Sequence, residues 1–252
     1  MRIGWFSTGR DEAARKLLRE VSGRISEGFI PRCEIAFVFC NREKGESKES
    51  DHFLSLCESL GLKTLSLSSK GFLPEKRLQD PEGWRELYHR EVLRLIEPFG
   101  VDLGVLAGYM LIVSPRFCKT LKLINLHPAL PGGPVGTWQE VIRRLIEGRA
   151  ERTGAMIHLV TEELDRGPVL SFFSIGIRGG AFDPLWEEVE RGSGEDALFR
   201  LIRQEEERRE VPLLVLTLKA LSEGRVRIEG ERVIPSAIDL SREVEEYLRR
   251  VP

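Results

Sequence analysis

The sequence predicts an α/β fold in which a mostly parallel, twisted sheet carries helices on both faces. Short apolar runs of strand length alternate with longer stretches whose apolar residues recur at helical spacing. That alternation is typical of parallel strands joined by crossover helices. Proline and glycine separate the two kinds of segment, as at Pro98 and Gly100. With 252 residues and 41% hydrophobic residues, the chain can bury one sizeable core.

The predicted strands are short runs rich in β-branched or aromatic residues and bounded by polar or turn-forming ones. Seven such runs span residues 3–6, 34–39, 64–67, 103–107, 121–126, 155–160 and 169–177. Two shorter strand-like runs, 225–229 and 232–235, follow near the C-terminus.

The predicted helices are amphipathic stretches between these strands. Between residues 11 and 27, for example, Leu17, Leu18 and Val21 recur at helical spacing. Similar stretches span residues 51–60, 84–96, 138–148 and 195–223, and a helical tail runs to the end. Residues 68–83 are expected to form a polar surface loop because they contain Pro74 and Pro81. We therefore predict one domain over residues 1–223 and a short extension over 224–252.

Charge and cysteine usage exclude several classes of protein. The 38 Lys and Arg residues nearly balance 40 Asp and Glu residues, so the sequence shows no electrostatic signature of nucleic-acid binding. No signal peptide and no apolar run of about 20 residues is evident, which predicts a cytoplasmic protein without membrane contact. The cysteines lack C-x-x-C spacing and are expected to be buried hydrophobic residues rather than metal ligands or disulfides: Cys33, Cys40, Cys57 and Cys118.

The most informative segment is Asn125-Leu126-His127-Pro128. Residues two apart in a strand point the same way, so Asn125 and His127 share a face. Pro128 cannot donate to a strand ladder and ends the strand at His127. An amide and an imidazole are thus expected side by side at the carboxyl end of a strand, where ligands bind in open α/β sheets.

A second segment, residues 161–168, also follows a predicted strand. It contains Glu162, Glu163 and Asp165 and closes with Gly167-Pro168. Such a tight loop can present Asp165 inward.

These side chains suit acyl transfer to nitrogen. Asn125 can donate a hydrogen bond to a developing oxyanion, and His127 can do so as imidazolium and also supply a proton. A neighbouring Asp165 would raise the pKa of that imidazole. No nucleophilic serine or cysteine is needed, because the acceptor amine attacks.

Each feature also has a structural interpretation. His127 can be a structural strand-end residue, and the acidic loop a solvated connection. His158 is expected to be a core or supporting histidine, whereas His52 and His89, on helical stretches, are expected to be exposed.

The two segments resemble the signatures of the folate-dependent formyltransferases. Residues 125–131, Asn-Leu-His-Pro-Ala-Leu-Pro, resemble the first signature, and residues 154–170 resemble the second. Residues 105–117 are similar to the family's folate-pocket segment. Order and spacing agree over residues 1–223. The resemblance implies a Rossmann-like formyltransferase fold with a C-terminal helical extension, and 10-formyltetrahydrofolate as co-substrate without a metal.

The resemblance also implies roles for individual residues. His127 would donate a proton, Asn125 would bind the oxyanion and Asp165 would raise the histidine pKa. Glu207 falls where the family places a carboxylate for the substrate amine. Residues implied to line the folate pocket are Leu106, Gly108, Met110, Leu111, Val113, Thr161, Glu162 and Glu163.

Within the family, the chain resembles most the glycinamide ribonucleotide formyltransferases of purine biosynthesis. Their first strand leads into a Gly-x-Gly-Ser-Asn loop that binds the substrate phosphate, whereas only Gly9 of that pattern remains in Thr8-Gly9-Arg10-Asp11. Arg10 can bind the phosphate in place of the backbone N–H groups of that loop. Alternatively, residues 8–11 form a capping box that starts the following helix. Leu111 replaces a usual arginine, and the loop after Pro131 is shortened.

These departures leave the acceptor open. It is glycinamide ribonucleotide or another amine, such as an amino sugar nucleotide, and a non-catalytic folate-binding paralogue is a third possibility. The sequence favours an NAD-dependent dehydrogenase least, because no G-x-G-x-x-G follows the first strand. The expected partners are small-molecule substrates, and the expected state is a monomer or homodimer.

Overall fold

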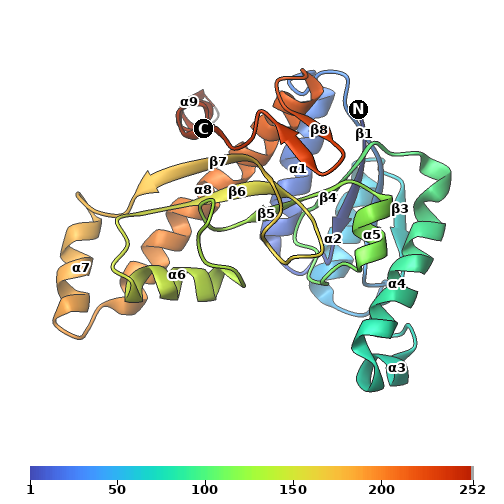
Figure 1. Cartoon of the computed structure of the whole chain (residues 1–252), viewed down its shortest axis with the longest axis horizontal. Helices are drawn as coiled ribbons and strands as arrows, with labels where there is room; N and C mark the ends of the chain where they lie inside the picture. Colours follow the sequence, from blue (N-terminus) through green and yellow to red (C-terminus); the bar gives the residue numbers. More distant parts are fainter. Residues whose placement is uncertain (251–252) are drawn as a thin grey trace. The chain divides into compact units, whose positions relative to one another are not determined.

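A computed structural model describes residues 1–250 of the chain. Its internal contacts divide it into two compact units, which we describe separately (Figure 1). The first unit comprises residues 1–125 and 159–167. The second comprises residues 126–158 and the chain from residue 168 onward.

The first unit is built on a parallel sheet. Its strands are β1 (Arg2–Ser7), β2 (Glu34–Cys40), β3 (Thr64–Ser66), β4 (Leu103–Leu106) and the start of β5 (Leu123–His127). They lie in the order β5-β4-β1-β2-β3, and every neighbouring pair is parallel. All five strands were predicted. The order reverses between β1 and β4, so their carboxyl ends diverge into loops at one edge, where such sheets bind ligands.

Helices cover both faces of this sheet, as predicted. Figure 1 shows α1 (Glu12–Ser26) and α2 (Lys48–Ser59) on one face, and α4 (Pro81–Ile96) and α5 (Pro115–Thr120) on the other. On the second face, Phe6 meets Phe37 and Phe117 edge-on, with ring centroids 5.5 and 5.7 Å apart. Helix α4 adds Trp84 and Tyr88 to this aromatic core.

The second unit has a mixed sheet. Strands β6 (Arg152–Leu159) and β7 (Val169–Gly176) pair antiparallel, and β10 (Ile238–Asp239) joins β7 in parallel. Helix α6 (Trp138–Glu147) packs with α7 (Phe182–Glu190) and α8 (Glu195–Ser222) through Ile142, Trp186 and Leu198. The hairpin β8 (Arg227–Glu229) and β9 (Arg232–Ile234) and helix α9 (Ser241–Arg250) follow. The mostly parallel α/β class and the helical C-terminal region are thus confirmed.

Several local expectations were wrong. The polar loop expected over residues 68–83 contains α3 (Pro74–Gln79), and α4 already begins at Pro81, because proline is well placed in a first helical turn. Short helices α5 and α7 and the 3-10 turn η1 (Glu97–Phe99) were not predicted. The boundary at residue 223 stays a prediction.

Two cysteines are buried as expected, Cys40 and Cys57, whereas Cys33 and Cys118 are half-buried, and all four are free thiols. Over residues 1–250, no helix combines the length and apolar character that a membrane span requires.

Candidate active site

Asn125 lies at the carboxyl edge of the parallel sheet in the first unit. It is the register partner of Leu106 on β4, which in turn pairs with Phe6 on β1. The segments that leave β1, β4 and β5 therefore start from neighbouring positions. Along β5, strand alternation gives Asn125 and His127 the same face and Leu126 the opposite one.

His127, the last residue of β5, belongs to the second unit and is only 2% exposed. Its Nε2 lies 2.9 Å from the carbonyl oxygen of Pro134. A carbonyl oxygen only accepts hydrogen bonds, so Nε2 carries a proton and donates it. The imidazole is therefore held as a donor by the loop that follows the signature.

That loop is the shortened segment after Pro131. Gly132 and Gly136 take positive φ angles of 76° and 114°, which glycine adopts without a Cβ penalty. The loop ends in a capping box between Thr137 and Glu140 that starts α6. The deletion noted in the sequence thus leaves a closed turn that reaches His127.

His158, on β6 of the same unit, is also buried and meets His127 edge-on, with ring centroids 6.3 Å apart. The sequence analysis expected His158 to be a core or supporting histidine, and its burial and its contact with His127 agree with that expectation.

The acidic loop lies in the first unit, beside β5. The Val160 N–H donates to the Leu123 carbonyl over 2.8 Å, which fixes the start of the loop. Asp165 takes a left-handed φ of 54°, a conformation in which aspartate is enriched. A Cβ on Gly167 would lie 1.7 Å from the Leu159 carbonyl oxygen, so glycine is required there. The loop is tight, as predicted, and its proposed partnership with His127 stays a prediction.

Thr161 and Glu162 are tied to neighbouring elements of the first unit. The Thr161 carbonyl accepts from Cys118 Sγ at 3.7 Å, and Glu162 pairs with Lys119 at 2.5 Å. Glu163 accepts a bond from the Thr161 hydroxyl through its backbone. The acidic loop is therefore attached to α5.

The predicted folate segment joins the end of β1. The Thr8 N–H donates to the Gly108 carbonyl over 3.0 Å, and the Met110 N–H donates to the Thr8 hydroxyl over 2.8 Å. Gly108 has a φ of 70°, as a turn at this point requires. Leu106 is buried at the end of β4.

Side chains along this segment alternate between the core and solvent. Leu111 and Val113 pack on the aromatic core, whereas Met110 and Ile112 are 49% and 51% exposed. Leu164 of the acidic loop is 52% exposed. Ile112 and Leu164 lie within the two segments, residues 106–113 and 161–165, that the resemblance implies for the folate pocket, and their contact with folate stays a prediction.

Of the two alternatives for residues 8–11, the capping box is wrong, and a phosphate site at Arg10 stays a prediction. Asp11 itself is the N-cap of α1 and accepts from the Ala14 N–H, while Thr8 bonds the folate segment. Gly9 takes a φ of 59°, and a Cβ there would lie 2.8 Å from Phe53. Arg10 Nε lies 3.1 Å from Asp11 Oδ2.

Glu207 lies on α8 in the second unit with its side chain 46% exposed. The nearest cation is Arg203, whose Nε is 3.8 Å from Glu207 Oε2. This distance is outside hydrogen-bonding range, so the carboxylate can accept donors from a substrate.

Comparison with known proteins identifies the family of the chain. The model of a family described as "Formyl transferase" matches residues 1–178. The chain belongs to the formyl transferase family. The matched range includes both signatures, the folate segment and the Gly9–Arg10 loop. Glu207 lies outside it.

The chain is also similar in sequence to individual members of the family. The phosphoribosylglycinamide formyltransferase of Dictyostelium discoideum is 33% identical over 161 residues, which cover 59% of this chain and 76% of the relative. That of Escherichia coli (strain K12) is 34% identical over 121 residues, which cover 47% of this chain and 55% of the relative. The second alignment thus spans about half of its relative.

Solved structures extend the likeness in fold. Glycinamide ribonucleotide transformylase 1 from Symbiobacterium toebii aligns with a TM-score of 0.66 and 22% identity over 92% of both chains. A formyltetrahydrofolate deformylase from Pseudomonas syringae pv. tomato aligns with a TM-score of 0.60 and 22% identity, over 92% of this chain and 64% of its own. Formyl transferase family membership and the fold therefore agree.

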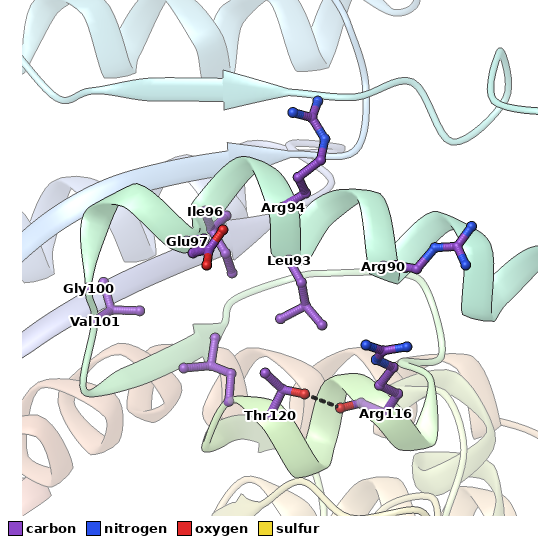
Figure 2. A pocket seen from close by; sticks show the side chains of 10 residues that line it. Arg90, Leu93, Arg94, Ile96, Glu97, Gly100, Val101, Arg116 and Thr120 are labelled. Atoms are coloured by element: carbon purple, nitrogen blue, oxygen red, sulfur yellow. Dashed lines mark hydrogen bonds between the residues drawn. The ribbon is translucent and has the colours of Figure 1, made fainter.

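A pocket of 410 Å³ in the first unit lies apart from the residues discussed above (Figure 2). It opens between α4 and α5, where Leu93 points inward and Arg90 and Arg116 lie toward one end. None of the site residues predicted for this formyl transferase family member lines it.

Histidines of the first unit give one further correction. His89 was expected to be exposed but is fully buried on α4, and its Nδ1 lies 3.0 Å from the Arg85 carbonyl. The Tyr109 hydroxyl lies 3.3 Å from Nε2. Burial lowers the pKa of His89 to about 4, so this imidazole is neutral at pH 7 and structural. His52 is exposed, as expected.

Within residues 1–250, no group of three or more histidine, cysteine or acidic side chains is placed to hold a metal ion.

Proposed function

We propose that this chain transfers the formyl group of 10-formyltetrahydrofolate to the amine of glycinamide ribonucleotide, and that Asn125, His127 and Asp165 carry the reaction. The observation that carries the proposal is the buried His127 at the strand end, with its Nε2 2.9 Å from the Pro134 carbonyl oxygen and with Asn125 on the same strand face. Family membership and the names of the relatives support the reaction and the acceptor.

In the proposed reaction the amine nitrogen bonds to the formyl carbon while the bond from that carbon to the folate nitrogen breaks. Negative charge develops on the formyl oxygen, and the Asn125 amide donates a hydrogen bond to it. Side-chain amides act in this way in oxyanion holes.

His127 supplies a second donor and moves the proton. Its protonated nitrogen faces the formyl oxygen once the Pro134 carbonyl is exchanged for substrate. The proton that the attacking amine loses passes by way of His127 to the departing folate nitrogen. His127 thus takes up one proton and gives up one, and the imidazole ends in its initial state. Asp165 stabilises the positive charge that His127 bears during this exchange.

Exposed apolar side chains in the first unit suit the aromatic part of the folate. Met110, Ile112 and Leu164 each leave about half of an apolar side chain exposed for contact with the folate, and the loop at Thr161–Glu163 supplies polar groups for the pterin edge. Aromatic ligands bind sites with this combination of apolar lining and few polar groups.

Two segments of the chain are proposed to bind different parts of the acceptor. Glu207 accepts hydrogen bonds from the acceptor, and the Gly9–Arg10 turn binds its phosphate. We further propose that the protein acts in the cytoplasm, as a monomer or homodimer, on small molecules alone. The near-neutral charge of the chain supports the absence of nucleic acid.

One assay tests the proposal. Purified protein is mixed with 10-formyltetrahydrofolate and glycinamide ribonucleotide, and release of tetrahydrofolate is followed. Turnover should depend on the ribonucleotide, and Asn125→Ala and His127→Ala should each lower kcat about 100-fold to 1,000-fold.

Both variants should retain the wild-type Tm within a few degrees, because each changes a strand end. Near wild-type turnover in either variant would refute the assigned mechanism. Turnover with an amino sugar nucleotide but not with glycinamide ribonucleotide would retain the chemistry and replace the acceptor.

A further inference from the structure

One face of α8 carries four charged residues at helical spacing: Arg203, Glu206, Glu207 and Glu210. The three carboxyl groups have different surroundings. Glu206 is fully buried and accepts a hydrogen bond from the Thr153 hydroxyl. Glu210 is nearly buried, whereas Glu207 reaches solvent. Only Glu207 is therefore placed to meet a ligand.

Arg203 is held on this face by two contacts that do not involve Glu207. Its Nη1 pairs with Glu210 Oε1, and its Nη2 lies 3.4 Å from Oε2, so the guanidinium forms a fork with that carboxylate. The guanidinium carbon also lies 4.8 Å from the centre of the Trp138 ring. Such stacking is favourable for arginine.

Glu210 thus competes with Glu207 for the same cation. Glu207 is four residues along the helix from Arg203, where an ion pair forms readily, yet the observed distance between Nε and Oε2 is 3.8 Å. Without Glu210, Arg203 retains only the contact with the Trp138 ring, which leaves its N–H groups available for a direct bond to Glu207.

We propose that Glu210 is a positioning residue for the acceptor site: by holding Arg203 against Trp138, it keeps the Glu207 carboxylate open to the acceptor. The inference rests on the proposed function of Glu207. It assigns to Glu210 and Arg203 control over acceptor affinity without contact with the acceptor.

The test is a pair of variants. Glu210→Gln keeps the shape of the side chain but releases Arg203, which should then bond Glu207. KM for glycinamide ribonucleotide should rise about tenfold, since the acceptor now competes with a charge-assisted bond. kcat and KM for 10-formyltetrahydrofolate should stay within about twofold. Removing the released cation in Arg203→Met/Glu210→Gln should restore KM to within about twofold of wild type.

Glu205→Gln is the matched control. It removes one carboxylate from the same helix, where Glu205 pairs with Arg209 instead. It should leave KM for the acceptor unchanged. A purely structural role for Glu210 predicts that the double variant is no better than Glu210→Gln, and that result would overturn the inference.

A crystal structure of Glu210→Gln without substrates separates this inference from the proposed function. The distance between Arg203 Nε and Glu207 Oε2 should shorten to about 3 Å. An unchanged distance would overturn the inference even if wild type formylates the ribonucleotide. Conversely, absence of formyl transfer by wild type would remove the proposed function, while a shortened distance would still establish the competition between Glu210 and Glu207.

Discussion

The Asp11 carboxylate accepts a hydrogen bond from the Ala14 backbone N–H, with Oδ1 and N 3.0 Å apart. The side chain therefore occupies one of the donors at the N-terminus of α1, and its second oxygen faces Arg10. Glu12 adds another carboxylate in the first turn. A helix N-terminus favours anions, but here the protein supplies its own. Any substrate phosphate at this turn must compete with Asp11.

Asp11→Ser should therefore tighten binding of the ribonucleotide. Serine retains the cap but removes the negative charge. KM for glycinamide ribonucleotide should therefore fall about twofold to fivefold, since charge effects near a helix end are worth about 0.3–1 kcal/mol. Asp11→Ala removes the same charge and also the cap, at a cost of about 1 kcal/mol in stability. Steady-state kinetics and thermal unfolding separate the two effects. Unchanged KM in both variants would place the phosphate elsewhere.

Arg10→Ala should have the opposite effect on the same substrate. If Arg10 pairs with the phosphate, KM for the ribonucleotide should rise more than about tenfold, because a hydrogen bond to a charged group contributes about 1.5–3 kcal/mol. KM for 10-formyltetrahydrofolate should not change. Arg19→Ala, which removes an exposed arginine near Glu12 on the same helix, is the control. An equal response to both substitutions would mean that only net charge matters.

Local sequence chemistry was enough to predict the strands of the first unit and the end of β5 at His127. Apolar runs set the five parallel strands, and Pro128 marks the end of β5 after His127. Tertiary packing decided the features that were missed. His89 lies on a helix with a mixed pattern, so its burial under α5 could not be deduced from periodicity. Short helices such as α3 have too few residues for a periodic signal.

The candidate site shows the same limit. Strand alternation predicts that Asn125 and His127 share one face of β5. The exposure of Ile112 and Leu164, in contrast, depends on which side of a loop faces the core. Asp11 could be recognised as a capping residue, but its position as the N-cap depends on Thr8 being taken by Met110. Such competition between hydrogen-bond partners far apart in sequence is decided only by the folded chain.

Asp165 has a conformational as well as a proposed chemical role, and two substitutions distinguish them. Asparagine tolerates the left-handed φ of 54°, so Asp165→Asn should keep stability while kcat falls about a hundredfold. Asp165→Ala should show the same loss of kcat and an added loss of about 1 kcal/mol in stability, because alanine is strained there. Wild-type kcat in Asp165→Asn would leave Asp165 with the conformational role alone.

His89 should make the protein sensitive to acid. Its pKa is about 4 in the folded state, against 6.5 for an unburied histidine, so the unfolded chain binds a proton that the folded chain excludes. The neutral, buried His89 contributes to the free energy of unfolding in full above pH 6.5. This contribution falls by on the order of 3 kcal/mol as pH falls toward 4. His89→Phe should flatten the fall in unfolding free energy between pH 7 and pH 4.5, as measured by urea denaturation. Replacement of the exposed His52 by Gln should leave the slope unaltered. Equal slopes in wild type and His89→Phe would contradict the prediction.

Glu206 should have the opposite dependence on pH. Burial raises its pKa from 4.5 to about 8, so the folded state holds a proton that the unfolded chain has released at neutral pH. The contribution of Glu206 to the free energy of unfolding is complete below pH 4.5. It declines as pH rises through about 8, by about 3–5 kcal/mol. Glu206→Gln stays neutral and can still accept from the Thr153 hydroxyl, so it should be more stable than wild type at pH 9 and similar at pH 5. Urea denaturation at the two pH values measures the difference, with Glu205→Gln as a control on the same helix. If wild type loses no more stability than Glu206→Gln between those values, Glu206 is ionised in the folded protein and the prediction is wrong.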